Sequence, residues 1–354
     1  MASFDPVLQR EFAVQVVRTL RERGFESYWA GGCVRDALLG RLPKDYDVAT
    51  TARPEQVREA FGRRRTIAVG VAFGVITVVG PGNAGHVEVA TFRQDAGYSD
   101  GRHPDAVEFS TPEADAQRRD FTVNGLFYDP LENRVIDFVE GQQDLARGII
   151  RAIGDPAARF SEDKLRLLRG VRFAAAFDFQ LDPATRAAIE AMSPDIAQVS
   201  AERIAAEMKL MLVRPGRVRA INLLAELGLL KPVLPELPMP QATVAVSATD
   251  QVANDAWPEA FNVLAGLDEP TFPVAFAALV RPFIDDQACR EVGRRWKLSN
   301  QEIQRIAWLI KHQDALVGAR HAPWPRLQRV LIHAGAAELV TLAAAIASAR
   351  RQTG

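Results

Sequence analysis

Cysteine and long apolar runs are what this sequence has least of. Its 354 residues include two cysteines, Cys33 and Cys289, which lie far apart and match no metal-binding spacing. We therefore expect neither a disulfide framework nor a zinc site, and a reducing, cytoplasmic setting fits best. No segment approaches the roughly 18 consecutive apolar residues of a membrane-spanning helix, and the first residues lack the basic stretch and apolar core of a secretion signal. The sequence therefore predicts no association with a membrane.

An excess of positive charge is also missing. The formal net charge is −1, which argues against a protein that coats nucleic acid through a broadly basic surface. Any contact with RNA must therefore be local. Lysine is scarce, because arginine supplies 37 of the 43 basic residues, and guanidinium groups suit bidentate contacts with phosphates and base edges. A GC-rich genome, which favours arginine codons, is the alternative explanation of this bias.

What the sequence does contain is an α/β pattern followed by a helical one. The chain is longer than a single core usually grows, so two or three packed units are expected. Up to residue 140, short segments rich in Val, Ile and Phe alternate with capped amphipathic segments, and from Asp144 onward helical periodicity dominates. We predict an α/β head over 1–140, a helical neck over 141–212 and a helical body and tail, which bind RNA, over 213–354.

Individual segments can be predicted as well. Residues 46–50 are expected to form a strand, and residues 155–177 are expected to form one long helix. The polar, glycine-containing residues 93–102 are too irregular for one element and predict a mobile loop. The weakly periodic, Pro- and Ala-rich residues 232–256 predict a linker or irregular segment.

Two aspartates, Asp45 and Asp47, lie two residues apart in an apolar-flanked segment. On a strand alternate side chains point to the same face, so both carboxylates are expected to converge. Unpaired they would repel, whereas Mg²⁺ is usually bound by one or two carboxylates together with substrate phosphates. The alternative is a pair of solvated surface acids. Glu88, between two valines of a predicted strand, is a third candidate that either assists the metal or the base or is solvated.

A glycine pair, Gly31 and Gly32, follows a predicted strand and precedes a predicted helix. At such a junction backbone N–H groups and the helix dipole can receive phosphate, and glycine permits close backbone approach. Arg35, one turn into the helix, is placed to add a charge-assisted contact to the same triphosphate. The alternative is an ordinary tight turn. Taken with Asp45 and Asp47, the pair predicts a nucleotide site with bound Mg²⁺.

These motifs resemble those of a known family. Residues 29–36, Trp-Ala-Gly-Gly-Cys-Val-Arg-Asp, followed by Lys-Asp-Tyr-Asp at 44–47, resemble the class II tRNA nucleotidyltransferases, the CCA-adding enzymes and their bacterial poly(A) polymerase relatives. The resemblance implies an α/β head of the polymerase-beta-type nucleotidyltransferase fold, a mixed sheet with helices, followed by an all-helical neck, body and tail. With it, Asp45, Asp47 and Glu88 are predicted to be catalytic, and Mg²⁺ is predicted to bind the first two.

A second motif extends the resemblance. Residues 118–124, Arg-Arg-Asp-Phe-Thr-Val-Asn, look like the family's motif that binds the ribose and discriminates against deoxynucleotides, and we call them the ribose motif. The resemblance implies that four of its residues contact the nucleotide: Arg118, Arg119, Asp120 and Asn124. The sequence departs from the family pattern, without losing a proposed catalytic group, at Ala114, Ala116, Gly125 and Lys164.

Residues 162–166, Glu-Asp-Lys-Leu-Arg, look like the family's nucleotide-selecting motif. Cytosine and adenine present an amino donor beside an unprotonated ring nitrogen, whereas uracil and guanine present a carbonyl beside an N–H. Asp163 would accept from the amino group and Arg166 would donate to the ring nitrogen, because residues three apart on one helix are neighbours. UTP or GTP would set like groups against each other, which costs on the order of a few kcal/mol. The predicted nucleotide-binding set also includes Glu162, Arg169 at the triphosphate or pocket wall, and Arg172 as support.

Contacts with RNA are predicted from arginines of the neck and body. The arginines that could follow an acceptor stem are Arg147, Arg151, Arg159, Arg214, Arg217 and Arg219. For each, the alternative is an ordinary surface arginine. In the resembling family the loop at 93–102 takes part in switching from C to A addition and is shortened in enzymes that add only CC. The loop here argues against a CC-only enzyme and leaves an A-only enzyme open.

The function predicted from these residues is the addition of CCA to the 3′ end of tRNA from CTP and ATP, without a nucleic-acid template and with Mg²⁺ as cofactor. An A-adding enzyme and a poly(A) polymerase are the alternatives within the fold. A noncatalytic RNA-binding module is the alternative from another class, and a small-molecule nucleotidyltransferase would leave the base-selecting segment without a purpose. The sequence does not predict the oligomeric state.

Overall fold

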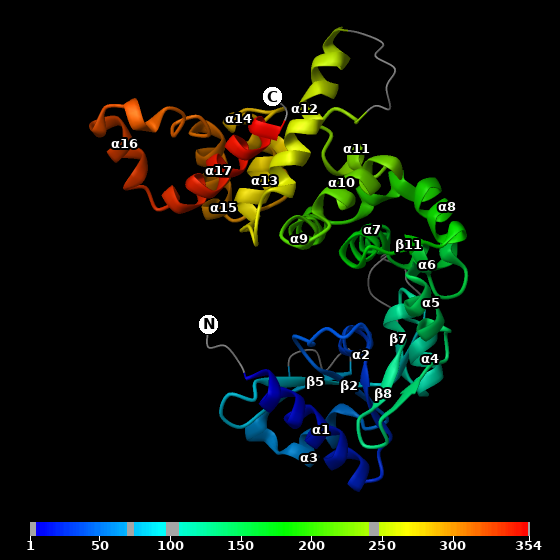
Figure 1. The fold of residues 1–354 in the computed structure, drawn as a ribbon. Coiled ribbons are helices and arrows are strands. Elements are labelled where there is room, and N and C mark those ends of the chain that lie inside the picture. Colours follow the sequence, from blue (N-terminus) through cyan, green and yellow to red (C-terminus); the bar gives the residue numbers. More distant parts are fainter. Residues whose placement is uncertain (1–4, 69–73, 97–105, 241–247, 353–354) are drawn as a thin grey trace. The chain divides into compact units, whose positions relative to one another are not determined.

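Two compact units make up the chain. The structure, a computed structural model, describes residues 5–68, 74–96, 106–240 and 248–352 (Figure 1). The first unit comprises Met1–Asp163 with Gln180–Thr185, and the second comprises Lys164–Phe179 with Arg186–Gly354. The domain boundaries predicted at residues 140 and 212 stay predictions.

Helices and strands alternate in the first unit. Its helices are α1 (Pro6–Glu22), α2 (Gly32–Leu38), α3 (Pro54–Phe61), α4 (Pro112–Gln117), α5 (Gly141–Arg147) and α6 (Pro156–Glu162), with 3₁₀ turns at Arg63–Arg65 and Thr122–Asn124. Its strands are β1 (Ser27–Ala30), β2 (Asp47–Thr50), β3 (Thr66–Ile67), β4 (Val75–Val79), β5 (His86–Thr91), β6 (Arg93–Ala96), β7 (Ala106–Phe109), β8 (Phe127–Asp129), β9 (Arg134–Ile136), β10 (Ile149–Ile150) and β11 (Gln180–Leu181). The α/β head predicted from the sequence is confirmed.

Seven strands form one mixed sheet in the order β3-β4-β5-β2-β1-β8-β9. Neighbours run antiparallel except β2 and β5, which are parallel and place Asp47 opposite Glu88. A parallel pair needs a long crossover connection, and α3, β3 and β4 lie between these two strands in the chain. Helices α1 and α3 pack on one side of the sheet and α2 lies on the other (Figure 1). The crossover thereby brings two distant acidic residues side by side.

Apolar side chains on both layers hold this unit together. Asp5 caps α1 by accepting hydrogen bonds from two backbone N–H groups of its first turn, and Phe12, Val16 and Leu20 on one face of the helix are buried. Elsewhere in the unit the rings of Phe92 and Phe127 meet edge to face with centroids 5.7 Å apart. Each such side chain contributes roughly 1.5–3 kcal/mol when it leaves water. The strands next to the acidic pair are therefore held on a packed support.

Two small strand pairs differ from the sequence prediction. Residues 93–96, predicted to begin a mobile loop, form β6, which pairs antiparallel with β7. Their polar composition hid the strand, because the residues lack the alternation of apolar and polar side chains that predicts a strand. Residues 97–102 of the predicted loop lie outside the described residues. Beyond residue 144, β10 and β11 pair in parallel, and two-residue strands are too short to produce a readable period.

The second unit is built from helices in the part that the structure describes. They are α7 (Leu165–Phe177), α8 (Pro183–Met192, which begins in the first unit), α9 (Ala201–Leu212), α10 (Arg217–Glu226), α11 (Leu230–Val233), α12 (Ala248–Ala265), α13 (Phe272–Val280), α14 (Asp286–Arg295), α15 (Asn300–Lys311), α16 (Trp324–Leu331) and α17 (Ala336–Gln352), with 3₁₀ turns at Ser193–Gln198 and Ala319–His321. The helical remainder predicted from the sequence is confirmed.

The core of the second unit centres on Trp296. Its ring centroid lies 5.2 Å from that of Phe276, and its indole N–H donates to the carbonyl of Val233 at 3.3 Å. Ser299 and Glu302 cap α15 reciprocally, each side chain accepting from the other residue's backbone N–H. Trp296 follows directly after α14, so its contacts join α11 and α13 to the end of that helix.

Two segment predictions need correction. The single helix predicted over 155–177 is two helices, α6 and α7, and the irregular segment predicted over 232–256 is entered by α11 and already helical from Ala248. Weak periodicity concealed the start of α12, because alanine contributes little to an apolar stripe. Among the described helices, none alone is long and apolar enough to cross a membrane; α16 and α17 qualify only as a pair bent by 111°.

Candidate active site

Two acidic side chains share one face of the sheet at the parallel strand pair. Asp47 is the first residue of β2, Glu88 is its partner in β5, and both side chains are exposed. Asp45 lies in a bend before β2, so the expectation that strand alternation orients both aspartates is wrong. The buried ring of Tyr46, 4.7 Å from that of Trp29, occupies the intervening position. We call Asp45, Asp47 and Glu88 the acidic cluster.

The acidic cluster carries negative charge that the protein only partly compensates. Although solvent reaches Asp47, the surrounding protein withdraws enough water to raise the pKa of its carboxyl to about 6, and the charges of Glu88 and Asp45 add to this rise. The Arg119 guanidinium acts in the opposite direction. A carboxylate that is costly to ionise without a counter-charge is suited to bind a cation.

The cluster fits a hard divalent ion that shares its ligands with a substrate. Among the described residues, no three His, Cys, Asp or Glu side chains converge closely enough to hold a metal ion by themselves. Mg²⁺ is usually held by one or two carboxylates plus substrate phosphates, and Asp45 and Asp47 supply such oxygens. Desolvation, together with repulsion from Glu88 and Asp45, raises the pKa of Asp47, and a divalent cation relieves both costs, so the donor set fits Mg²⁺.

The glycine pair lies where predicted, at the junction of β1 and α2: Gly31 is the N-cap of α2 and Gly32 is its first residue. Gly31 has φ of +69°, a backbone conformation that side chains disfavour, and its N–H donates to the carbonyl of Leu126 at 3.0 Å. A Cβ on Gly31 would lie 2.8 Å from Nη1 of Arg119. The backbone therefore requires glycine here, and a side chain would in addition displace the Arg119 guanidinium. We call Gly31 and Gly32 the glycine turn.

Arg35 joins the glycine turn to the ribose motif. Its Nη1 donates to Oδ1 of Asn124 at 2.6 Å, and its Nε and Nη2 donate to Oδ1 of Asp36 at 2.8 and 2.7 Å. Asn124 in turn donates through Nδ2 to Oδ1 of Asp120 at 3.0 Å. The structure thus brings two motifs that are 89 residues apart in the sequence into one hydrogen-bonded chain. Contact of Arg35 with a triphosphate stays a prediction.

Asp115 is a residue that the sequence prediction missed. It is 1% exposed, and its carboxylate accepts from Nε and Nη2 of Arg118 and from Nε and Nη2 of Arg119. Burial alone would raise the pKa of Asp115, but the two guanidinium groups outweigh it and hold the pKa below its usual value. The available signal was an acid three and four residues before two arginines on a helix.

The nucleotide-selecting motif lies at a break between two helices. Glu162 ends α6 and accepts from Arg159 at 3.0 Å, and Asp163 follows with extended backbone angles of φ −151° and ψ 106°. Arg166 belongs to the first turn of α7. The expectation that Asp163 and Arg166 are neighbours on one helix is therefore wrong. No Gly or Pro marks the break, but aspartate competes with helical hydrogen bonds and favours helix ends.

The other two arginines of the predicted set lie on α7. Arg172 is buried and its Nε is 2.6 Å from a carboxylate oxygen of Glu207, which ties α7 to α9. The guanidinium of Arg169 lies 5.4 Å from the ring centroid of Phe173, and that of Arg172 lies 4.1 Å from it on the same helix. The contacts of Arg172 are those of a supporting residue.

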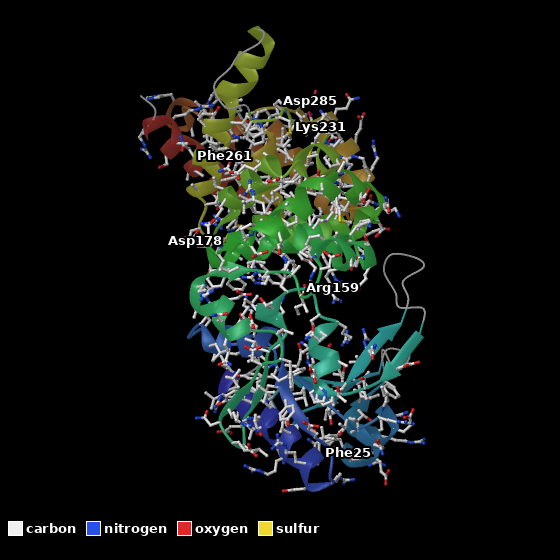
Figure 2. The ribbon with its side chains drawn as sticks, turned by 90° about the vertical axis from the view of Figure 1, so that its right-hand side faces the viewer. Phe25, Arg159, Asp178, Lys231, Phe261 and Asp285 are labelled. Atoms are coloured by element: carbon white, nitrogen blue, oxygen red, sulfur yellow. The ribbon has the colours of Figure 1, made fainter. Side chains whose placement is uncertain are left out.

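Four of the arginines predicted to follow RNA have internal partners. Arg151 binds Asp144 and Asp182, and Arg159 (Figure 2) donates to backbone carbonyls at residues 117, 118 and 153. Arg219 pairs with Asp178. Arg217 is 7% exposed and donates to three backbone carbonyls, so its predicted contact with RNA is wrong. These bonds stabilise the fold, and the pattern of charges alone could not reveal them.

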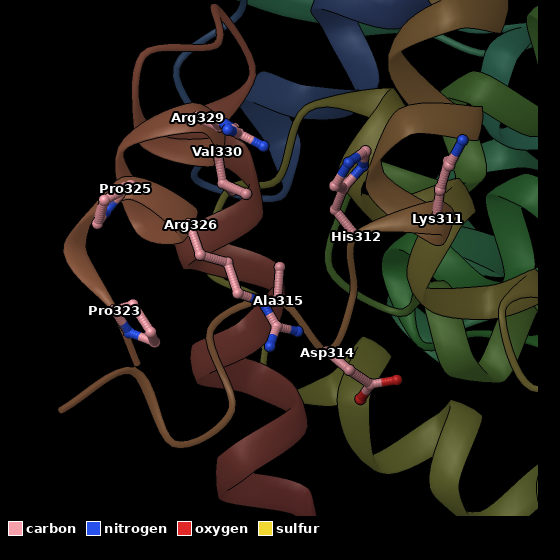
Figure 3. Close-up of a pocket in the computed structure, with 9 residues that line it drawn as sticks. All are labelled: Lys311, His312, Asp314, Ala315, Pro323, Pro325, Arg326, Arg329 and Val330. Atoms are coloured by element: carbon pink, nitrogen blue, oxygen red, sulfur yellow. The ribbon is translucent and has the colours of Figure 1, made fainter. Parts of the chain in front are cut away.

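A basic cavity of about 640 Å³ lies in the second unit, and none of the predicted site residues lines it. Lys311, Arg326 and Arg329 supply positive charge, and Arg329 points toward His312 (Figure 3). The His312 ring stacks on Trp308 with centroids 4.7 Å apart. Asp314 also lines the cavity and offsets one of these charges, so the lining carries a net positive charge, and no motif in the sequence had indicated it.

Two stretches of the chain match known families. Residues 27–151 match the family described as the poly A polymerase head domain. Residues 178–239 match the family described as the probable RNA and SrmB-binding site of polymerase A. The first match contains the acidic cluster, the glycine turn and the ribose motif, whereas the second falls mostly in the helical unit.

Some of the proteins that match most of this chain are named CCA-adding enzyme, and one is named poly(A) polymerase I. The CCA-adding enzyme of Enterococcus faecalis is 36% identical over 303 residues, which are 84% of this chain and 69% of that protein. Poly(A) polymerase I of Haemophilus influenzae is 39% identical over 251 residues, 67% of this chain, and the match spans 54% of that protein's length.

Two solved structures that are similar to this chain are also those of CCA-adding enzymes. The crystal structure of the Bacillus stearothermophilus CCA-adding enzyme in complex with CTP matches with a TM-score of 0.77 and 29% identity, over 97% of this chain and 82% of that one. The Thermotoga maritima CCA-adding enzyme complexed with tRNA matches with a TM-score of 0.68 over 98% of this chain and 80% of that one, at 21% identity, and supports the fold.

Proposed function

The chain belongs to the family of the CCA-adding enzymes and bacterial poly(A) polymerases, which are nucleotidyltransferases, and on this premise we propose that it adds C, C and A to the 3′ end of tRNA. The nucleotides come from CTP and ATP, and no template is used. The observation that carries the proposal is the acidic cluster, in which Asp47 and Glu88 are partners on neighbouring strands, and β2 pairs with the strand that leads into the glycine turn.

The proposed reaction is attack of the RNA 3′-hydroxyl on the α-phosphorus of the incoming nucleotide with loss of pyrophosphate. A bound Mg²⁺ ion would supply activation of the hydroxyl and neutralisation of charge on the leaving oxygens. Asp45 and Asp47 would hold this ion, and Glu88, in register with Asp47, would add a third carboxylate. The cation also relieves the repulsion that these acids impose on one another.

The nucleotide is proposed to lie between the glycine turn and the ribose motif. The Gly31 N–H is bound to the carbonyl of Leu126, so Gly31 contributes close backbone approach, Gly32 presents its backbone N–H to the phosphates, and the Arg119 guanidinium beside Gly31 supplies a positive charge. Asp120, which accepts from Asn124 and from the backbone N–H of Phe121, is held in a fixed orientation. It is suited to accept from a ribose hydroxyl.

Base choice is assigned to Asp163 and Arg166 by the complementarity of their donors and acceptors to cytosine and adenine. The two residues flank the break between α6 and α7, so helical geometry does not set their spacing. Glu162 lies beside Asp163, and Arg169 and Arg172 lie further along α7. Support comes from the CTP-bound structure of a CCA-adding enzyme that this chain resembles over 97% of its length.

The RNA is proposed to be tRNA. Residues 178–239 match a family described as a probable RNA-binding site, and one structural relative is described as complexed with tRNA. A poly(A) polymerase is the second candidate, because a protein of that name is 39% identical over 251 residues. The two functions differ in where addition stops.

One incorporation assay separates the two candidates. The purified chain receives tRNA that ends before C, after CC or after CCA, with CTP, ATP or both in the presence of Mg²⁺. We expect addition to complete a single CCA end and then stop, with no product on the CCA-ended tRNA. Continued A addition to every RNA would make the chain a poly(A) polymerase. Binding of tRNA without any incorporation would make it a noncatalytic RNA-binding protein.

A further inference from the structure

One buried carboxylate holds both arginines that begin the ribose motif. Oδ1 of Asp115 accepts from Nε and Nη2 of Arg118 at 2.9 and 2.7 Å, and Oδ2 accepts from Nε and Nη2 of Arg119 at 3.2 and 2.9 Å. Oδ1 also accepts from the backbone N–H of Arg93 at 3.3 Å. Five donors on one carboxylate fix its position and, through the paired Nε and Nη2 atoms, the plane of each guanidinium.

The hydrogen bonds between Asp115 and Arg119 determine which edge of the Arg119 guanidinium faces the glycine turn. With Nε and Nη2 bound to Asp115, Nη1 donates to the carbonyl of Asn124 at 3.2 Å and lies 2.8 Å from where a Cβ of Gly31 would be. The guanidinium also lies 5.0 Å from the ring centroid of Phe127. An arginine held on three sides in this way loses little rotamer freedom when a ligand binds.

We propose that Asp115 is a positioning residue, which holds the Arg119 guanidinium against the glycine turn so that it is preorganised for the triphosphate of the incoming nucleotide. Asp115 is buried and acts through Arg119. The inference rests on the proposed function, because it assigns a role in nucleotide binding to a residue that supports the same site. It adds that affinity for the nucleotide depends on a carboxylate outside the ribose motif.

The test compares Asp115→Asn with a matched variant in the same unit. Asparagine keeps the shape of the side chain but turns an amide toward two guanidinium groups, which frees Arg119. Asp129→Asn removes a carboxylate that is also fully buried and bound to an arginine, Arg21 at 2.6 Å, at the far end of β8. Both variants lose a buried ion pair, but only the first changes the neighbourhood of Gly31.

We expect Asp115→Asn to raise the dissociation constant of CTP, measured by equilibrium titration without tRNA, and the KM for CTP about tenfold, the factor that corresponds to about 1.4 kcal/mol. The KM for tRNA should not change, because the perturbation is local to the nucleotide. Asp129→Asn should lower thermal stability and leave both CTP constants unchanged. A general loss of structure would instead lower kcat for both variants and leave the CTP constants alone.

A double-mutant cycle shows whether Asp115 acts through Arg119. Arg119→Ala should weaken CTP binding, and adding Asp115→Asn should weaken it by less than about twofold more. If Asp115→Asn does not fold, Asp115→Glu keeps the charge, displaces the carboxylate by one methylene and should weaken CTP binding in the same direction. Unchanged CTP affinity in these variants, or independent effects in the cycle, would overturn the inference. A wild-type chain that neither binds CTP nor incorporates it would instead refute the proposed function.

Discussion

Replacing Asp47 by asparagine should stabilise the ion-free protein while it abolishes activity. The pKa of Asp47 is raised from 3.8 to about 6, and such a shift corresponds to about 3 kcal/mol for a fully buried group. Solvent reaches Asp47, so screening reduces the effect and we expect about 1 kcal/mol. For a unit of this size, that raises Tm by about 2–4 °C.

The stability gain should depend on pH in a defined direction. Because the folded-state pKa of Asp47 lies above its unfolded value, the unfolded chain releases this proton first as the pH rises. The ionised side chain therefore lowers the stability of the folded protein progressively between pH of about 4 and 6. Below that window Asp47 is neutral in both states, and Asp47→Asn should match the wild type. Above pH of about 6 the full difference in stability between Asp47→Asn and the wild type should be present.

Thermal unfolding of wild type and Asp47→Asn in EDTA, at several pH values, measures this difference. Asp129→Asn serves as the control, because that carboxylate is paired with Arg21 and its loss should lower Tm. Added Mg²⁺ should stabilise the wild type more than Asp47→Asn, since the ion binds the folded form. An unchanged or lower Tm for Asp47→Asn in EDTA would refute the view that the acidic cluster is electrostatically strained.

Three further changes have defined outcomes. Arg172→Ala leaves Glu207 buried without its partner and should lower the free energy of unfolding by about 3–5 kcal/mol, measured by urea titration. Gly31→Ala places a Cβ 2.8 Å from Arg119 at φ +69°, and the dissociation constant of CTP in an equilibrium titration should rise at least about tenfold. Asp163→Asn should reduce the preference for CTP over UTP at least about tenfold in single-nucleotide incorporation, because the amide can donate to the uracil carbonyl.

The sequence predicted the elements of the head because its signals are local. Asp5-Pro6 marks the start of α1, the glycine turn marks the start of α2, and the segments rich in Val and Ile at residues 75–79 and 86–91 form β4 and β5. The pairing of Asp47 with Glu88 could not be predicted, since it depends on a crossover between β2 and β5 that no local pattern specifies. The sequence predicted the three residues of the acidic cluster, but it is the folded sheet that brings Asp47 and Glu88 together.

Buried charge was the hardest feature to predict. Asp115, Arg172 and Arg217 look like ordinary surface charges in the sequence, yet each is buried and paired with partners 3 to 50 residues away. The break between α6 and α7 at Asp163 was not predicted either. Helical periodicity continues on both sides of it, and only the backbone of one residue departs.

The central claim is that the acidic cluster is the reaction centre, and the most direct measurement is Mg²⁺-dependent incorporation by Asp45→Ala and Asp47→Ala. Each variant is given tRNA that ends before C, together with CTP and ATP, after circular dichroism has verified its fold. Both variants should incorporate no nucleotide while they still bind tRNA as tightly as the wild type does. Incorporation at the wild-type rate by either folded variant would contradict the account.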